Sequence, residues 1–507
     1  MSETIINYDN TNKYLPDTLR QFVGANDRMM RQDFTLFEAM YEGIEKQAVF
    51  NNRIAAEYAS GFTRLNYVYL RSGVAPKLVD IITSKAVDRV WYQAAEENEV
   101  VFDDYLDRNY FSDMLYKGFE EAAITARSIM VVYPKKNDIE IATYNLFRHR
   151  IIYDGKNNIK EAYIYIISDS FEASVKQVIC EHRYYKTEKD DNGQNINVPY
   201  QKFIVYSVRQ NNNGTEVKEL EEKDLSKEFK AKYGNVEFNK AKKLEYPSIG
   251  VYDIRYSKFN KKFFDSDIPE AMFTDAVDNA VVVDTSITGK EVDKEIGRGQ
   301  ILMPDPYQQE NMPYMNQMEA GTRVMRSLTV TYKDPTIKKY PSRSMEDSKP
   351  TNVQFDMRST EWISGIDNDI ARLCESVGVG IIDFCPRLLG GNQRTDDEIN
   401  AMTDITANTV KAFRNINEAK INALLTDAAT YFKLNVKVSI RWSMASILNP
   451  SKNTDLIIRQ LDAGLISRKE AIRRANPDLN EKEVDDLYKE VVTEQGAMAT
   501  ENAFNKF

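Results

Sequence analysis

Histidine, cysteine, glycine and proline are all scarce in this sequence. Its 507 residues include only 2 His, 3 Cys, 21 Gly and 15 Pro. Two histidines cannot supply a tri-histidine zinc site or the paired histidines of a metalloprotease helix. The cysteines, Cys180, Cys374 and Cys385, form no CxxC pair, so they suit reduced thiols in a cytosol-like compartment better than a disulfide framework. Sparse glycine and proline favour long, uninterrupted helices and strands over a loop-rich fold.

Long apolar runs and an excess of cations are also missing. No run approaches the roughly 20 residues that cross a bilayer, and residues 1–9 lack the basic-then-apolar pattern of a signal peptide. The sequence therefore predicts a soluble protein with no membrane partner, made inside the cell. The formal charge is −10, from 67 Lys+Arg and 77 Asp+Glu. This charge gives no global reason to hold nucleic acid tightly, because phosphate binding is driven by cations.

The usual catalytic and cofactor motifs are absent too. There is no GxSxG nucleophile elbow, and the Thr-Gly-Lys-Glu stretch at 288–291 lacks the upstream glycine and following hydroxyl of a phosphate-binding loop. His149 and His182 lie among Arg and Tyr in strand-like sequence, where we expect a structural role. The acids of residues 396–398 are typical of a helix N-terminus. We therefore expect no catalytic residue, no cofactor and no metal.

Hydrophobic periodicity divides the N-terminal half into a helical and a strand-like part. Residues 1–128 have mostly helical periodicity, including an apolar stripe from Leu78 to Trp91. Strand-like runs and turn signals over 129–220 predict an antiparallel meander, with a hairpin that turns at Asp154-Gly155. The Lys/Glu-rich stretch 221–245 is expected to be a solvated connector. The predicted fold class is α+β, predominantly helical, with several domains.

The chain then becomes helical again around a small insert. Asp267 as a cap, Pro269 in the first turn and Glu270 three residues after the cap predict a helix that starts near residue 266. Residues 265–296 carry nine acidic side chains against two lysines. Residues 297–357 contain six prolines and a strand candidate at 328–332. They are predicted to be a small insert between two helices.

The helix after the insert carries an apolar seam with alternating steps of three and four residues. Its members are Ile363, Ile366, Ile370, Leu373 and Val377. Such a seam must face another helix or a second subunit.

The remaining third is predicted to be mostly helical. A capping box at 395–398 opens a helix that could run to about residue 433. Its apolar stripe would consist of Ile399, Met402, Val410, Phe413, Ile421, Leu424, Leu425 and Ala428. Residues 436–442 alternate as a strand. Two or three helices close the chain, with N-terminal signals at Ser467 and Asn480.

Three blocks in the last third are the most distinctive. They are residues 361–381 followed by Asp383-Phe384 and Gly390-Gly391, then residues 395–400, and then residues 463–474 closing with Asn476-Pro477. With the order of elements in the N-terminal half, these blocks resemble the portal proteins of tailed double-stranded-DNA bacteriophages. The type is that of long-tailed phages of Gram-positive hosts.

The resemblance implies a portal fold with named regions. Residues 1–262 would form most of the wing, with the β-meander at 129–220. The other regions would be stem helices at 263–296 and 358–378, a clip at 297–357, a tunnel loop at 379–394, a long tunnel helix at 395–433, a wing strand at 434–450 and crown helices at 451–507.

The resemblance also implies a function and partners. A portal is a ring, dodecameric in the virion, that sits at one capsid vertex after assembly in the host cytoplasm. Double-stranded DNA passes through it without sequence specificity during packaging and ejection. Its partners would be the terminase large subunit, head-completion or adaptor proteins, and the major capsid and scaffolding proteins. It would not be an enzyme.

Two sets of channel residues are expected from this placement. The tunnel-loop set is Arg387, Gly390, Gly391, Asn392, Gln393 and Arg394, and the acidic stem set is Asp275, Asp278, Asp284, Glu291, Asp293 and Glu295. The acids would repel DNA, while Arg387 and Arg394 would be transient phosphate contacts. Two alternatives stay open: an acidic multidomain enzyme or regulator with an unrecognised site, and another virion structural or scaffold protein without a channel.

Overall fold

The structure is a computed structural model of the 507-residue chain. The residues it describes are 37, 41, 72–87, 90–93, 106, 108, 110–135, 138–154, 158–168, 175–189, 193–211, 214–221, 237–244, 248–261, 266–296, 300–304, 318–319, 322–323, 337–340, 351–353, 359–385, 396–431, 439–442, 457–476 and 484–493. The chain divides into two compact units. Unit 1 comprises Met1–Arg53, Ala75–Val277 and Cys374–Phe507, and unit 2 comprises Ile54–Val74 and Asp278–Leu373.

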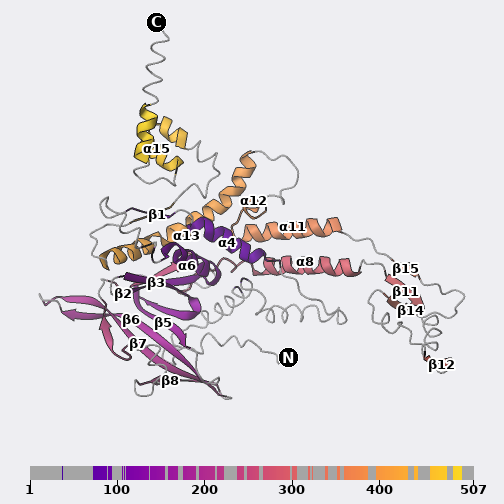
Figure 1. The fold of residues 1–507 in the computed structure, drawn as a ribbon, viewed down its shortest axis with the longest axis horizontal. Helices are drawn as coiled ribbons and strands as arrows, with labels where there is room; N and C mark the ends of the chain where they lie inside the picture. Colours follow the sequence, from indigo (N-terminus) through magenta and orange to yellow (C-terminus); the bar gives the residue numbers. More distant parts are fainter. Residues whose placement is uncertain are drawn as a thin grey trace, which may run out of the picture. The chain divides into compact units, whose positions relative to one another are not determined.

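Figure 1 shows the helices and strands of the described residues. Their bounds are α4 (Val74–Val87), β1 (Val90–Gln93), α6 (Phe111–Thr125), β2 (Arg127–Lys135), β3 (Asp138–Asn145), η3 (Leu146–Arg148), β4 (His149–Tyr153), β5 (Ile159–Ser168), β6 (Val175–Lys189), β7 (Asn195–Asn211), β8 (Gly214–Leu220), β9 (Ala241–Lys243), β10 (Val251–Arg255), α8 (Val277–Ile296), β11 (Gln300–Pro304), β12 (Met318–Glu319), β13 (Thr322–Arg323), β14 (Ile337–Tyr340), β15 (Thr351–Val353), α11 (Ser359–Ser376), α12 (Ile381–Phe384), α13 (Asp396–Tyr431), β16 (Ser439–Trp442) and α15 (Arg468–Ala475).

Two antiparallel sheets replace the single predicted meander of residues 129–220. One sheet has the order β10-β2-β3, and the other has the order β4-β5-β6-β7-β8 with β9 on β7. The predicted hairpin is confirmed, because β4 pairs antiparallel with β5 from His149↔Ile164 to Tyr153↔Ile159. The two sheets share a core that includes Ile129 and Ile164, both with no exposed surface.

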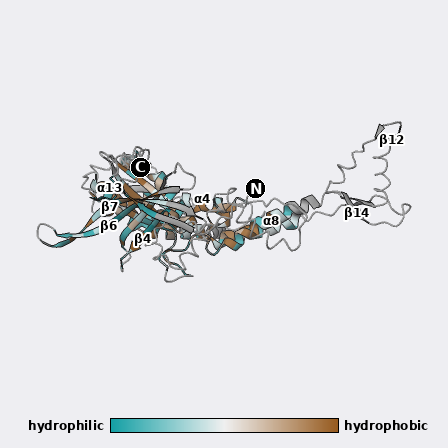
Figure 2. Cartoon of the chain, turned by 90° about the horizontal axis from the view of Figure 1, so that it is seen from below, coloured by the Kyte–Doolittle hydropathy of each residue, from teal (hydrophilic) through white to brown (hydrophobic). Residues whose placement is uncertain are grey.

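The longest strand pair is the hairpin of β6 and β7. The two strands pair from Val175↔Arg209 to Lys189↔Asn195, whereas β5 accompanies β6 only as far as Tyr184. The end of the hairpin therefore extends beyond its neighbour and is hydrophilic (Figure 2). Lys186 and Lys189 are exposed there, and Ile196 is the one large apolar side chain that the described part of this tip exposes.

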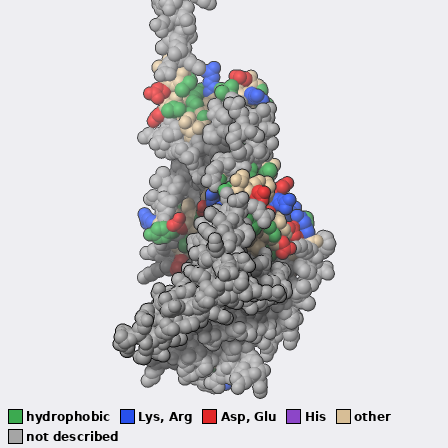
Figure 3. Space-filling model, turned by 90° about the vertical axis from the view of Figure 1, so that its right-hand side faces the viewer, with side chains coloured by type: hydrophobic (Ala, Val, Ile, Leu, Met, Phe, Trp, Pro, Cys, Tyr) green, Lys and Arg blue, Asp and Glu red, His purple; other side chains and the backbone are tan. Residues whose placement is uncertain are grey.

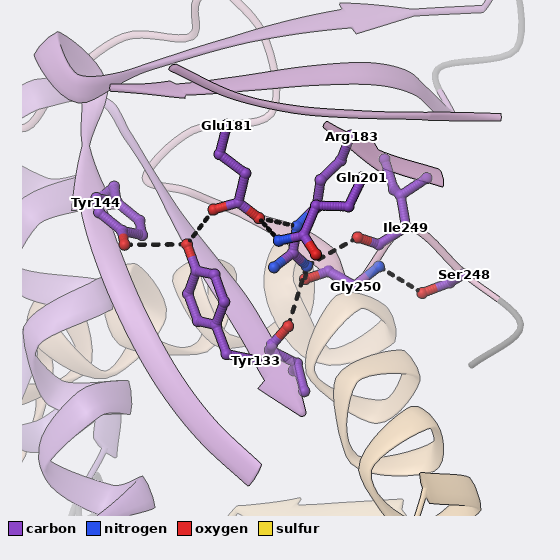
Figure 4. A network of polar contacts seen from close by, with 9 residues as sticks. Tyr133, Tyr144, Glu181, Arg183, Gln201, Ser248, Ile249 and Gly250 are labelled. Carbon is purple, nitrogen blue, oxygen red and sulfur yellow. Dashed lines mark hydrogen bonds and ion pairs between the residues drawn. The ribbon is translucent and has the colours of Figure 1, made fainter. Parts of the chain in front are cut away.

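A buried ion pair joins the two sheets. In Figure 4, Arg183 and Glu181 of β6 point into the space between the sheets, with Arg183 Nε 2.5 Å from Glu181 Oε1 and both side chains 0% exposed. Arg183 Nη1 lies 3.0 Å from the carbonyl oxygens of Val132 and Ile249, which belong to the β2/β10 side. A buried charge pair is tolerated only with good geometry and further hydrogen bonds.

Neighbouring side chains supply these further hydrogen bonds to Glu181. Tyr133 donates its hydroxyl to Glu181 Oε2 at 2.6 Å, and Gln201 Nε2 donates to Glu181 Oε1 at 2.6 Å. Burial, and then the adjacent Glu181 carboxylate, raise the pKa of Tyr133 well above its ordinary value, so this hydroxyl stays a donor.

The predicted long helix is confirmed as α13, Asp396–Tyr431, with 36 residues. At 1.5 Å per residue it is roughly 54 Å long. Its predicted apolar stripe faces the core, since Val410, Phe413, Ile421, Leu424, Leu425 and Ala428 are buried. The same stripe holds buried polar residues that periodicity does not reveal, namely Thr406, Arg414 and Asn417.

The predicted helical stripe from Leu78 to Trp91 is wrong at its end. Helix α4 stops at Val87, and Val90–Gln93 forms β1, which pairs antiparallel with β16 (Val90↔Trp442). A strand partner some 350 residues away in sequence overrides the local pattern.

The expectation of a wholly solvated connector at 221–245 is also wrong in its described part. Phe238 and Leu244 are buried, and β9 hydrogen-bonds β7.

The expected helix start at Asp267 is wrong as well. Residues 266–276 form bends and turns, and α8 begins only at Val277. Glu270 does not complete a capping box. Its Oε1 accepts the backbone N–H of Lys261 at 2.8 Å, while its own backbone N–H donates to Ser257 Oγ at 2.9 Å. Tertiary hydrogen bonds therefore hold this segment where a local cap was expected.

The described residues of the insert of unit 2 include short strands. Strand β11 pairs in parallel with β14 and antiparallel with β15, and β12 pairs with β13. The strand candidate at 328–332 lies outside the described residues.

The C-terminal helices show the predicted cap at Ser467. Its Oγ accepts the Glu470 backbone N–H at 3.1 Å. Lys469 Nζ lies 2.5 Å from Asp485 Oδ1 and so joins α15 to the helical residues 484–493. Charges of both signs lie among exposed apolar side chains on these helices (Figure 3), including Leu465 at 75% exposure. The start predicted at Asn480 lies outside the described residues.

We predict that Arg183→Met lowers the free energy of unfolding of unit 1 by about 3–5 kcal/mol, because it leaves the buried Glu181 carboxylate without its cation. Urea unfolding followed by tyrosine and tryptophan fluorescence measures this. Lys189→Met, an exposed position on the same strand, is the matched control and should change stability by less than about 0.5 kcal/mol. Equal small effects of both variants would contradict a role for the pair in joining the sheets.

Candidate functional site

Helices α8 and α11 of unit 2 are the predicted stem pair, and the structure places them side by side. Ser286 Oγ donates to Asp369 Oδ2 at 2.8 Å. Gly289 lies directly against Trp362: a Cβ at this glycine would be 2.9 Å from the Trp362 ring. The close approach explains why a glycine stands in the middle of α8, where it costs about 1 kcal/mol of helix stability.

The acidic stem residues have different environments. Asp284 Oδ1 accepts the backbone N–H of Ser72 at 2.8 Å, so this carboxylate has a structural partner within unit 2. Asp275 and Asp278 are exposed. Glu291, Asp293 and Glu295 lie on α8, but their side chains are outside the described set.

The predicted seam of α11 is only partly buried. Ile366, Leu373 and Val377 are at most 9% exposed, and Ile370 is half-buried. Ile363 is 47% exposed, and Val282 on α8 is 46% exposed. The first part of the seam therefore has apolar surface that the described residues leave open.

Helix α11 ends in a turn that is pinned to α13. Gly378 has a positive φ of 73°, and the backbone N–H of Val379 donates to the carbonyl of Cys374 at 2.8 Å, as at a glycine helix terminus. Thr409 Oγ1 donates to the Gly378 carbonyl at 2.8 Å. A Cβ at residue 378 would lie 2.4 Å from Thr409 Oγ1. Together with the positive φ, this contact favours glycine at this position.

Three side chains hold the next turn, α12, in place. Thr406 Oγ1 accepts the backbone N–H of Gly380 at 2.7 Å and donates to Asp383 Oδ2 at 2.5 Å. Lys85 Nζ of α4 donates to Asp383 Oδ1 at 2.6 Å. We call Lys85, Asp383, Thr406 and Thr409 the turn anchor. It ties residues 378–385 to α13 and α4 within unit 1.

The turn anchor was not found by sequence reasoning. Asp383 was noted only as part of a family-like block, and no motif announced Lys85, Thr406 or Thr409. The residues of the anchor are far apart in sequence and become neighbours only in the fold. The predicted tunnel-loop residues follow this anchor directly, but Arg387, Gly390, Gly391, Asn392, Gln393 and Arg394 all lie outside the described residues.

The two histidines have structural surroundings. His149 is buried, with Nδ1 2.7 Å from the carbonyl oxygen of Asn145. His182 is stacked between Tyr163 and Tyr184, at ring-centroid distances of 4.2 and 4.6 Å, and its Nε2 lies 3.2 Å from Glu161. Burial lowers the pKa of His182 despite this carboxylate. Within the described part of the chain, no group of three or more His, Cys, Asp or Glu could hold a metal ion.

The cysteines are free thiols. Cys180 and Cys374 are buried, and burial raises the pKa of both, that of Cys374 to about 12. These two are therefore small apolar core residues. Cys385 is half-buried. None of the described helices is long and apolar enough to span a membrane.

Comparison with known proteins gives weak likenesses only. No family model and no curated protein matches the chain. A chain of the virion of the native gene transfer agent (GTA) particle is similar at 11% identity and a TM-score of 0.41, over 85% of this chain and 99% of that chain. A chain of the neck of the native GTA particle computed with C12 symmetry is similar at 10% identity and a TM-score of 0.41, over 83% of this chain and 97% of that chain. A chain of the neck of the empty GTA particle computed with C6 symmetry is similar at 12% identity and a TM-score of 0.42, over 84% of this chain and 99% of that chain. Values this low do not establish a shared function.

We predict that Gly378→Ala destabilises the turn by about 1–3 kcal/mol from the positive φ alone, and further through the Thr409 contact. Gly464→Ala is the matched control, because Gly464 has a φ of 69° but nothing within 4 Å of a new Cβ. Hydrogen exchange of peptides covering 374–385 and 457–476 measures each local effect. If Gly378→Ala opens its turn no more than Gly464→Ala does, the turn is not pinned on α13.

We predict that iodoacetamide modifies Cys385 of the native chain well before Cys374 or Cys180. Burial shields the latter two, and a pKa of about 12 leaves Cys374 almost wholly protonated at pH 8. Peptide mass spectrometry of timed samples measures the order, and labelling in denaturant should make the three thiols equivalent. Native labelling of Cys374 at the rate of Cys385 would contradict this packing at the end of α11.

Proposed function

We propose that the chain is a phage portal protein, which forms a ring-shaped channel for double-stranded DNA at one capsid vertex. One observation carries the proposal, namely the order and form of the elements from Val277 to Tyr431. The helix α8 leads into a small insert of short strands, α11 returns, a glycine turn follows, and the 36-residue α13 completes the series. This series follows the portal order of stem, clip, stem, tunnel loop and tunnel helix that the sequence blocks suggested.

The partly uncovered seam of α11 supports assembly into a ring. In a closed ring, each subunit contacts its neighbours through two different surfaces, and apolar side chains left open in the monomer are covered. Ile363 and Val282 are apolar, each nearly half exposed, and lie on the paired helices α8 and α11. We propose that neighbouring subunits cover them, with twelve subunits in the virion.

The charge of the chain supports a conduit that does not grip DNA. Each phosphate that a protein neutralises adds to a hold that translocation would have to break. The segment 265–296 has nine acids and two lysines, and Asp275 and Asp278 are exposed. Asp284 and Glu270 each accept a main-chain N–H within the chain. We assign the repulsive role to Asp275 and Asp278 because they are exposed, and to Glu291, Asp293 and Glu295. Arg387 and Arg394 remain our proposed transient phosphate contacts.

The proposed mechanism is passive. The ring docks the ATP-driven terminase through the clip at 297–357, and head-completion or adaptor proteins bind there later. It then retains the packaged genome until ejection. The turn anchor would fix the base from which the tunnel loop extends, because residues 378–385 are held by side chains of α13 and α4. The chain is proposed to take part as a virion structural component and not as an enzyme.

We predict that the purified full-length chain forms closed rings. Native mass spectrometry gives the number of subunits, and negative-stain images show the channel. Ile363→Asp should shift the assembly towards smaller species without unfolding, because a charge at a buried apolar contact costs several kcal/mol. Ile196→Asp, at a similarly exposed position (44%) on the β6–β7 hairpin, is the control and should leave the ring intact.

A chain that stays monomeric or dimeric at every concentration and salt condition would overturn the portal proposal. Rings without a central channel would instead favour another virion structural protein. Far-UV circular dichroism of both variants shows whether a loss of rings comes from unfolding.

A further inference from the structure

Two arginines stand directly opposite each other where β10 pairs with β2. In this antiparallel register Arg255 faces Arg127, and Asp253 lies two residues before Arg255 on the same side of the strand. Like charges directly opposite each other destabilise a strand pair unless something compensates them. The arrangement is therefore unusual for a stable sheet.

Asp253 compensates only part of this charge. Its side chain is 0% exposed; Arg255 Nε lies 2.5 Å from Oδ2, and Lys420 Nζ of α13 lies 3.1 Å from Oδ1. The three cations act together to lower the pKa of Asp253 although burial alone would raise it. Among the ion pairs of the described residues, Asp253 is the carboxylate partner of both Arg255 and Lys420, and Arg127 has no ion-pair partner. Three positive charges are thus set against one negative charge.

Arg127 is the least balanced member of the cluster. It is 3% exposed, and its Nη1 donates to the Tyr153 hydroxyl at 3.2 Å and to the Asp267 carbonyl at 3.3 Å, both uncharged acceptors. Among the described residues, no acceptor lies within hydrogen-bond distance of its buried Nε. Burying an arginine without an anion is costly. The buried Arg127 Nε–H is therefore suited to donate a hydrogen bond to an anionic ligand.

The surroundings hold these groups in fixed positions. The Tyr153 ring centroid lies 4.9 Å from the Arg255 guanidinium and 5.9 Å from that of Arg127. Asn417 Oδ1 accepts the Arg255 backbone N–H at 2.8 Å, and Asn417 Nδ2 donates to the Arg255 carbonyl at 2.9 Å. Lys420 is three residues after Asn417, on the same face of α13. The two guanidinium groups are therefore already held in place before a ligand binds, so binding costs little side-chain entropy.

We infer that this cluster binds a small oxyanion of the phosphate class. The surplus of two positive charges matches a phosphate dianion, and guanidinium groups fit its oxygens with paired hydrogen bonds. A free ion fits better than the backbone of a nucleic acid, because Arg127 is almost wholly buried. Arg255 (19% exposed) and Lys420 (35% exposed) are the members of the cluster whose side chains solvent reaches. The inference does not depend on the proposed portal function.

Thermal unfolding of the full-length chain in sodium phosphate and in sodium chloride of matched ionic strength tests the inference. A ligand that binds only the folded chain raises the unfolding midpoint in a saturable way. We expect phosphate to do so, and equilibrium dialysis with radiolabelled phosphate to give one ion per chain. Arg127→Met and Lys420→Met should each weaken phosphate binding at least about tenfold, because each removes a charge-assisted hydrogen bond. Lys189→Met is the control and should leave it unchanged.

The variants separate a ligand site from a purely structural cluster. If Arg127→Met lowers the midpoint equally in phosphate and chloride while the phosphate effect persists, Arg127 is structural and the inference fails. Should Arg127→Met not fold, Lys420→Met carries the test, since the Lys420 side chain is 35% exposed. Equal midpoints for the wild-type chain in the two salts also overturn the inference. A 20-base-pair DNA duplex is the second probe: stabilisation by the duplex through Arg127, but not by inorganic phosphate, would overturn the free-ion assignment.

Discussion

Helix α13 organises unit 1 because its buried and half-buried polar side chains hydrogen-bond main-chain groups of other segments. The contacts are Thr406 with the N–H of Gly380, Arg414 with the carbonyls of Lys85 and Ala86, Asn417 with the N–H and carbonyl of Arg255, and Asn422 with the N–H of Ile440. Main-chain groups buried without partners are costly. The main-chain groups of each segment therefore find their hydrogen-bond partner at one position along α13. In this way α13 fixes the positions of β10, α4, β16 and the turn after α11.

The elements that local pattern could predict are those whose stability has a local source. The stripe of α13, the seam of α11 and the β4–β5 hairpin each repeat with the period of their structure, and the structure has them close to the expected bounds. The predictions are wrong where a partner far away in the sequence determines the local structure. Val90–Gln93 is apolar enough for a helix end but pairs with β16. Glu270 has the spacing of a capping residue but accepts the Lys261 N–H.

The candidate site divides in the same way between what pattern showed and what it could not. The position of the turn was predictable, since a seam ending at Val377 and the following glycines mark the end of a helix. The turn anchor was not, because Thr406 and Lys85 are ordinary residues until the fold brings each of them within 2.6 Å of the Asp383 carboxylate. Asp284 was read as a channel acid, yet its carboxylate binds the Ser72 N–H. A local charge count does not distinguish a carboxylate that caps a main-chain group from one that faces solvent.

Buried charges of both signs cancel in the described interior. Arg183 and Arg414, both at most 2% exposed, direct their guanidinium groups to main-chain carbonyls inside unit 1. Arg127 is buried as well, and three carboxylates, those of Glu181, Asp253 and Glu270, are buried with these arginines. Three buried cations thus stand against three buried anions. Because the described interior is balanced, the formal charge of −10 belongs to residues that the described core does not bury.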